Sequence, residues 1–181
     1  MNLLLRLAWI VVRWVWRKPT IYLLDTSCVP FLVFPNDLDP YGHMNNGRYL
    51  TLMDLGRLDL MLRTRMWKIT RAQKWNPLIG ASWIIHKKPL LPFQRFALKT
   101  TVTTWDETWF YMVQRFERKG QTYAQGFVKG LCRGPDGNVP TAVLLKAMGL
   151  SAEPKQDMAY IAQWLAAEKS YLEQDKSMKA P

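Results

Sequence analysis

A short segment of the chain carries the residue types from which hydrolytic chemistry is built. Two carboxylates stand two residues apart, and a histidine and two asparagines follow just before a run of good helix formers: Asp37, Asp39, His43, Asn45 and Asn46. A carboxylate in this place can act as a general base or as a nucleophile. The unpaired backbone amides of a first helical turn can hold an anion or a developing oxyanion. The segment therefore predicts a base and an oxyanion site as neighbours.

The helix that follows is predicted to run from residue 46 to about residue 65 and to be mainly buried. Leucine and methionine side chains are spread over most of its circumference, which indicates contacts on several sides. Asp39 and Asn45 are also residue types that cap helix N-termini, where they accept hydrogen bonds from the first amides. From the residues alone, the catalytic and the capping interpretations of Asp39 both stay open.

Three other side chains have two interpretations each. Asp37 either raises the basicity of Asp39 or binds a nearby arginine, because alternate residues of an extended segment point to the same side. His43 either acts as a general acid or base, since imidazole titrates near neutrality, or orders the loop by hydrogen bonding. Asp54 has i, i+3 spacing to Arg57, so it either pairs with this arginine or faces a substrate channel.

The rest of the chain predicts one antiparallel sheet. Five apolar or alternating runs are separated by turn residues, and the expected strands lie at 29–34, 78–85, 93–105, 109–118 and 122–133. They are followed by a turn at 135–138, a short helix at 141–148, a helical stretch opening at 151–154 and a loose polar tail from Gln174. This order of elements indicates an α+β protein whose curved sheet wraps around the central helix.

Composition narrows the functional classes. The 181 residues suit one domain, and 25 Lys and Arg against 14 Asp and Glu give a formal charge of +11. This charge favours anionic partners, but the basic residues are spread out and lack the dense clusters of a nucleic-acid binder, so no nucleic-acid partner is predicted. Two cysteines and two histidines do not have the spacing of a metal site, and the low cysteine count fits a reducing compartment.

The N-terminal segment is apolar but too short and too charged to predict a membrane span. Residues 3–16 are interrupted by Arg6 and Arg13, and Arg17-Lys18-Pro19 follows. On a helix the arginines form a narrow cationic stripe among leucine, valine and tryptophan side chains. Such a helix either lies in the headgroup region of an anionic membrane, with its arginines reaching the phosphates, or packs on its own domain or a partner subunit.

The segment from Asp37 to Tyr49 also carries a family resemblance. It reads D-x-D-x-x-G-H-M-N-N-x-x-Y, is continued on the helix by Asp54 and Arg57, and resembles the signature of hotdog-fold thioesterases of the 4-hydroxybenzoyl-CoA thioesterase type. The run at 105–111, the apolar N-terminus and the tryptophan at 164 are similar to the thioesterase superfamily member 6-like branch, which has a membrane-associated N-terminus.

The resemblance implies the hotdog fold, a curved antiparallel sheet around a central helix, with extra N- and C-terminal helices. The expected organisation is a helix in residues 1–24, a hotdog domain in 25–150, and a helix with a polar tail in 151–181. Family members pair their sheets, so a homodimer or a larger homo-oligomer is expected. The location implied is cytoplasmic, with residues 3–18 as the part that touches an anionic membrane surface.

The resemblance also implies the chemistry. Asp39 corresponds to the catalytic carboxylate, with amides near Asn45 and Asn46 as oxyanion donors and with Asp37, His43 and Asp54 as secondary site residues. The substrate implied is a fatty acyl or related thioester of coenzyme A, which belongs to the substrate, so no separate cofactor and no metal is expected.

Two other functions remain open on the same residues. One is a catalytically weak, membrane-associated hotdog module that binds acyl chains or scaffolds partners. The other is a hotdog dehydratase, which ranks last because such enzymes use a histidine with an acidic residue on the central helix, and here His43 precedes that helix.

Overall fold

A computed structural model describes residues 2–17, 20–150 and 158–178 of the chain. Its helices are α1 (Asn2–Arg17), the 3-10 helix η1 (Pro35–Asp37), α2 (Asn46–Arg63), α3 (Met66–Ala72), α4 (Thr141–Ala147) and α5 (Ala159–Met178). Its strands are β1 (Ser27–Leu32), β2 (Asn76–His86), β3 (Arg95–Trp105), β4 (Phe110–Arg118), β5 (Gln121–Gly134) and β6 (Gly137–Val139). The predicted central helix and the five predicted strands are all present.

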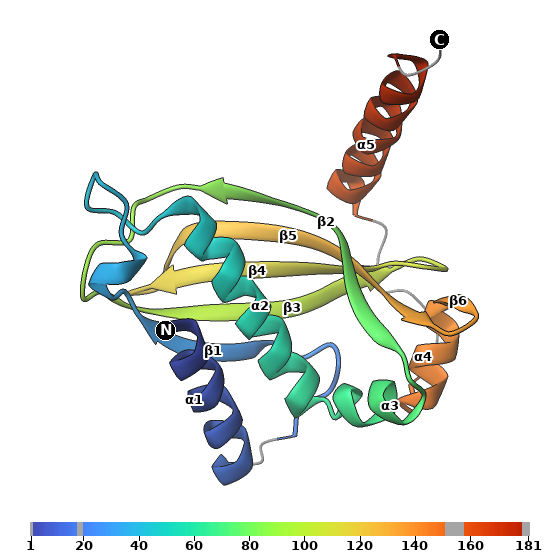
Figure 1. Cartoon of the computed structure of the whole chain (residues 1–181), viewed down its shortest axis with the longest axis horizontal. Helices are drawn as coiled ribbons and strands as arrows, with labels where there is room; N and C mark the ends of the chain where they lie inside the picture. The colour runs from blue at the N-terminus through green and yellow to red at the C-terminus, as the bar shows by residue number, and fades with distance from the viewer. Residues whose placement is uncertain (1, 18–19, 151–157, 179–181) are drawn as a thin grey trace.

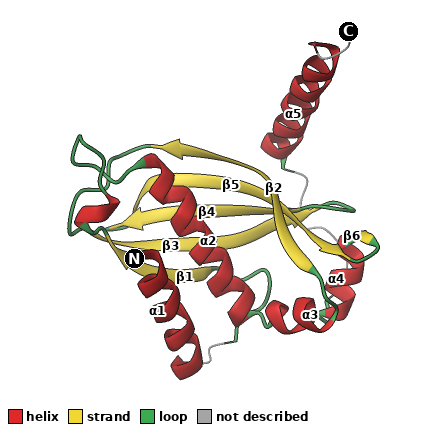
Figure 2. Cartoon of the chain, in the orientation of Figure 1, coloured by secondary structure: helices red, strands yellow, loops and turns green. Residues whose placement is uncertain are grey.

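The strands form one antiparallel sheet that curves around α2, as Figure 1 and Figure 2 show. The strand order is β1-β3-β4-β5-β2, and β6 pairs with the end of β5. Strand β3 alternates buried and half-buried side chains along most of its length, which is the period of two that its sequence predicts. The α+β architecture expected from the order of elements is confirmed.

Helix α2 is buried because the sheet covers one side of it and α1 lies along another. Its Tyr49 and Met53 side chains belong to the same core cluster as Phe116 of β4. Helix and sheet approach closely at Gly56, where an added Cβ would lie 2.7 Å from Thr100 Oγ1. This contact fixes the position of α2 and therefore of its N-terminal end.

Helix α1 packs on its own domain, with two arginines facing inward. Arg6 Nη2 lies 2.5 Å from Asp37 Oδ2, and Arg13 Nη1 lies 3.2 Å from Asp59 Oδ1. The two carboxyl-bearing residues are buried, with exposures of 0% and 1%. Of the arrangements that the sequence left open for this segment, packing on its own domain is the one observed. These two arginines bind carboxylates of the protein instead of facing outward.

Much of the remaining surface of α1 is apolar and exposed. Its large side chains, which are 38% to 85% exposed, are Leu3, Leu4, Leu5, Trp9, Val11, Val12, Val15 and Trp16. Among the described residues, no helix combines the length and the apolarity that crossing a bilayer requires.

Helix α5 docks on the sheet by its first half and then projects away from the body (Figure 1). The ring of its Trp164 lies edge-on to that of Trp83 on β2, with 6.3 Å between the centroids. The prediction of a loose tail from Gln174 is wrong as far as Met178, where α5 ends. Residues 151–154, where the sequence predicted the start of this helix, lie outside the described residues.

Helix α2 ends at Arg63, close to the predicted end at about residue 65, but the sequence did not predict α3, which follows after a break. The break lies at Arg65, which adopts a left-handed backbone conformation with φ of 60°. Residues other than glycine rarely adopt this conformation, so an arginine gives no local signal for it. The turn predicted at 135–138 is present and leads into β6, which the sequence did not predict as a strand.

Candidate active site

Asp39 lies in the loop between η1 and α2, where hydrogen bonds hold its backbone and one carboxylate oxygen. Its amide donates to the His43 carbonyl at 2.8 Å. Its Oδ1 accepts hydrogen bonds from the amides of Tyr41, at 2.9 Å, and His43, at 3.2 Å. The chain turns at Gly42, whose φ of 78° suits glycine. Oδ2 makes no hydrogen bond to any residue that the structure describes, so this half-buried carboxylate has one held and one available oxygen.

Asn45 is the N-cap of α2. Its side-chain oxygen accepts a hydrogen bond from the Gly47 amide, and its own amide donates to the Asp37 carbonyl, both at 2.8 Å. The Asn45 amide is therefore already hydrogen-bonded within the loop. Asn46 is the first residue of α2, and its amide is one of those that a helix start leaves without an intrahelical partner. Asn46 is thus the better placed of the two predicted donors.

Asp37 binds arginine, which is one of the two interpretations that its sequence position left open. The Arg6 guanidinium donates to both carboxylate oxygens, from Nη1 at 3.2 Å and from Nη2 at 2.5 Å. The Phe34 amide donates to Oδ2 at 2.9 Å, and Arg48 Nε lies 3.7 Å from Oδ1. These contacts give Asp37 a structural role under the loop that carries Asp39.

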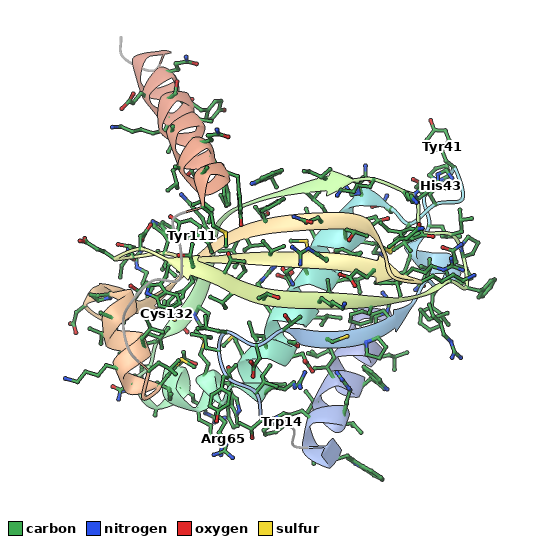
Figure 3. All side chains as sticks on the ribbon, turned by 180° about the vertical axis from the view of Figure 1, so that it is seen from behind. Trp14, Tyr41, His43, Arg65, Tyr111 and Cys132 are labelled. Atoms are coloured by element: carbon green, nitrogen blue, oxygen red, sulfur yellow. The ribbon has the colours of Figure 1, made fainter. Side chains whose placement is uncertain are left out.

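A polar cavity of about 240 Å³ opens beside Asp39 at the start of α2. It is lined by Asp39, His43, Met44, Asn46, Tyr49, His86, Lys87, Lys88 and Pro89. Figure 3 shows His43 and Tyr41 at this end of the sheet. The loop, the helix start and the end of β2 therefore meet at one cavity, which contains a carboxylate, two imidazoles and two ammonium groups.

His86 is a lining residue with a titratable side chain that the sequence did not assign to the site. It ends β2, and its ring lies edge-on to that of Tyr49 with 4.7 Å between the centroids. Partial burial lowers the pKa of His86 below its ordinary value, and burial raises the pKa of Tyr49. A lone histidine after a strand carries no local signal, because only the pairing of β2 with β5 brings it to the start of α2.

A second, apolar cavity of about 230 Å³ lies toward the other end of α2. Leucine, isoleucine and methionine side chains from α2, β2 and β5 form most of its wall. Asp54 and Arg57, at its edge, form the ion pair that their spacing predicts. Cys132 also lines it, and burial raises the pKa of this thiol to about 11. Figure 3 shows Cys132 and His43 at opposite ends of the sheet, so the two cavities are separate.

Of the predicted site residues, the structure brings Asp39, His43 and Asn46 to one cavity. Asn45 caps the helix beside it, and Asp37 lies beneath the loop. Asp54 lines the apolar cavity instead.

Comparisons with known proteins agree with this fold. A family model described as the Thioesterase-like superfamily matches residues 33–148. Protein THEM6 of Danio rerio is 34% identical over 131 residues, which make up 71% of this chain and 63% of that protein. A probable thioesterase of Saccharomyces cerevisiae is 31% identical over 101 residues, or 55% of this chain and 41% of that protein. The match thus spans less than two thirds of either relative.

Solved structures with the same architecture are more distant in sequence. The probable thioesterase YbaW from Escherichia coli has a TM-score of 0.62 at 18% identity, covering 67% of this chain and 97% of that one. A 1,4-dihydroxy-2-naphthoyl-CoA thioesterase from Synechocystis has a TM-score of 0.59 at 14% identity, covering 68% and 95%. These likenesses confirm the predicted hotdog fold. Because the family model matches well over half of the chain, the chain belongs to the Thioesterase-like superfamily.

Proposed function

We propose that the chain hydrolyses acyl thioesters of coenzyme A at the polar cavity beside Asp39. The observation that carries this proposal is the state of the carboxylate, which has one oxygen held by two amides and the other available. It lies next to the N-terminus of α2, where the helix dipole stabilises negative charge. The thioesterase names of the relatives support the same reaction class.

Two routes fit a carboxylate in this position. In the first, Asp39 takes a proton from water, the water oxygen attacks the thioester carbon, and the carbon–sulfur bond breaks. The thiolate then takes up a proton and leaves a carboxylic acid behind. In the second, Asp39 attacks the carbon and forms an anhydride as the thiolate leaves, and water then cleaves the anhydride. Both routes need a donor to the carbonyl oxygen, for which we assign the Asn46 amide.

The carrier that suits this cavity is coenzyme A, which stays part of the substrate. Lys87 and Lys88 line the cavity and place positive charge beside Asp39. Ammonium groups bind phosphate as point charges. Lys88 is held in place by a hydrogen bond of 2.7 Å from its Nζ to Gln121 Oε1.

The acyl group proposed is a fatty acyl chain. We assign the exposed apolar face of α1 to the surface of an anionic membrane, which suits both a net charge of +11 and the delivery of such a chain. Cys28 and Cys132 are free thiols, in keeping with the cytoplasmic side of that membrane.

The assembly proposed is a homodimer formed through β2. This strand is at the edge of the sheet and is 11 residues long, and its Leu78, Ile79 and Ile85 side chains are 41% to 45% exposed. A long edge strand with apolar side chains offers unpaired backbone groups to a second copy.

The test is thiol release from short, medium and long acyl-CoA esters by the protein and its Asp39→Asn variant. Asparagine keeps an Oδ1 acceptor for the two loop amides, so the melting temperature should stay near that of the parent protein. The substitution removes the base and the nucleophile together, so turnover should fall by at least about 100-fold. Asn45→Asp, which keeps the cap acceptor, controls for general changes at the helix start.

The outcome decides between the two functions still open. A lost turnover in the variant at unchanged stability supports the thioesterase and defines its range of chain lengths. If the parent protein shows no turnover above background with any ester, the proposal fails. The catalytically weak, membrane-associated acyl-binding module would then be the better description, with Asp39 as a turn residue.

A further inference from the structure

We propose that Arg6 of α1 is a positioning residue for the loop that carries Asp39, an inference that rests on the proposed function. Arg6 does not line the polar cavity, and among the described residues its guanidinium donates hydrogen bonds to Asp37 and Leu32, which do not line it either. Its effect on the reaction would therefore pass through Asp37. The consequence is that α1 belongs to the catalytic unit and is more than an anchor.

Arg6 and Asp37 form a bidentate salt bridge. Two guanidinium nitrogens donate to two carboxylate oxygens, and Nη2 also donates to the Leu32 carbonyl at 2.8 Å. The ring of Phe34 lies 5.2 Å from the guanidinium carbon, so the group is enclosed as well as bonded. A planar fork of this kind fixes orientation as well as distance, which a single charge contact does not.

Asp37 in turn holds both ends of the site loop. Its carbonyl accepts the hydrogen bond from the amide of Asn45, the cap of α2, at 2.8 Å. Between these two residues the loop closes on itself, because the Asp39 amide donates to the His43 carbonyl and a β-bridge joins Leu38 to Met44. The orientation of Asp37 therefore sets the position of Asp39, two residues along, relative to the start of α2.

Arg48, a second cation near Asp37, does not make the same bidentate contact. Arg48 Nε lies 3.7 Å from Oδ1, beyond normal hydrogen-bond distance, and its side chain is about one third exposed. Without Arg6 the buried carboxylate would lose its bidentate partner and would gain by moving toward water. Any such movement shifts the loop.

The experiment compares Arg6→Met with Arg13→Met in the full chain. Both variants remove an α1 arginine from a buried carboxylate, but the partner of Arg13 is Asp59, in the second half of α2 and away from the loop. With acyl-CoA substrate, Arg6→Met should lower kcat by about 10- to 100-fold, the effect of a small misplacement of a reacting group. Arg13→Met should keep kcat within about twofold at a temperature where both variants are folded.

Two further measurements keep the proposal falsifiable. Arg6→Lys retains the charge without the fork, so its kcat should lie between those of the parent protein and Arg6→Met. Hydrogen exchange of the amides from residue 39 to residue 45 should quicken in Arg6→Met and not in Arg13→Met. Equal kcat and equal exchange in the two methionine variants would overturn the proposal. If the parent protein has no turnover, the proposed function fails, and the exchange comparison alone decides the role of Arg6.

Discussion

Replacing Arg13 with methionine tests whether α1 is part of the folded unit. The residue that it binds, Asp59, is 1% exposed and accepts hydrogen bonds from Arg13 Nη1, at 3.2 Å, and from Ser27 Oγ, at 2.5 Å. Arg13 Nη2 also donates to the Cys28 carbonyl at 3.0 Å. The substitution keeps the length of an apolar stem but removes both contacts and leaves a buried carboxylate with fewer partners.

The expected loss of stability follows from what Asp59 retains. Removing one partner of a buried ion pair costs about 3 to 5 kcal/mol when the charge is left alone. Here Ser27 stays bonded and Arg63 Nη1 lies 3.6 Å from Oδ2, so a smaller loss of about 2 to 3 kcal/mol is expected. For a chain of this size, that loss lowers the melting temperature by roughly 4 to 12 °C.

The assay is thermal and urea unfolding followed by circular dichroism, on the parent protein, Arg13→Met and the double variant Arg13→Met/Asp59→Leu. The double variant should recover part of the loss, because leucine replaces the uncompensated buried charge. A melting temperature of Arg13→Met within about 1 °C of the parent value would refute the reasoning. It would mean that this ion pair does not hold α1 on the domain in solution.

Three further predictions concern the core, the site and the apolar cavity. Gly56→Ala should lower the free energy of unfolding, measured with urea, by about 1 to 2 kcal/mol, because the new Cβ would lie 2.7 Å from Thr100 Oγ1. This overpacking outweighs the better helix propensity of alanine. A gain in stability would contradict the prediction. Partial desolvation lowers the pKa of His86, which is still exposed, so the unfolded chain binds more protons below about pH 6.5 and stability falls slightly as pH drops through that range. His86→Gln should flatten the slope of melting temperature against pH between about 5 and 7, and an unchanged slope would count against this assignment. Burial raises the pKa of Cys132 to about 11, so this thiol should react with a thiol reagent at about pH 8 only when urea unfolds the chain, and fast reaction in the folded protein would contradict its burial.

Most of the fold could be predicted from the sequence because its signals are local. The alternation along β3 and the two-residue turn at Lys119-Gly120 mark hairpin strands without knowledge of their partners. Leucine and methionine around α2 mark a buried helix in the same way. Helix α3 was missed because it is short and because Arg65, which separates it from α2 in a left-handed backbone conformation, gives no local signal.

The site residues likewise fall into those that local sequence predicts and those that it does not. Asp39, His43 and Asn46 lie within eight residues, so their proximity follows from one turn and one helix start. His86 reaches the same cavity only through strand pairing, and Arg6 reaches Asp37 only through the docking of α1. Residues that join a site only through tertiary contacts have no characteristic spacing in the sequence, so the sequence does not predict them.

Helix α1 shows most clearly what periodicity leaves undecided. The pattern correctly places Arg6 and Arg13 on one stripe, but it does not say which side of the helix meets the protein. Surface helices usually turn their apolar side inward. Here two buried carboxylates bind these arginines: Asp37, 31 residues after Arg6, and Asp59, 46 residues after Arg13. A buried carboxylate without a cation is strongly unfavourable. The arginine side therefore faces the domain together with Ile10, which is fully buried in the core, and most of the other apolar side chains of α1 are left outward.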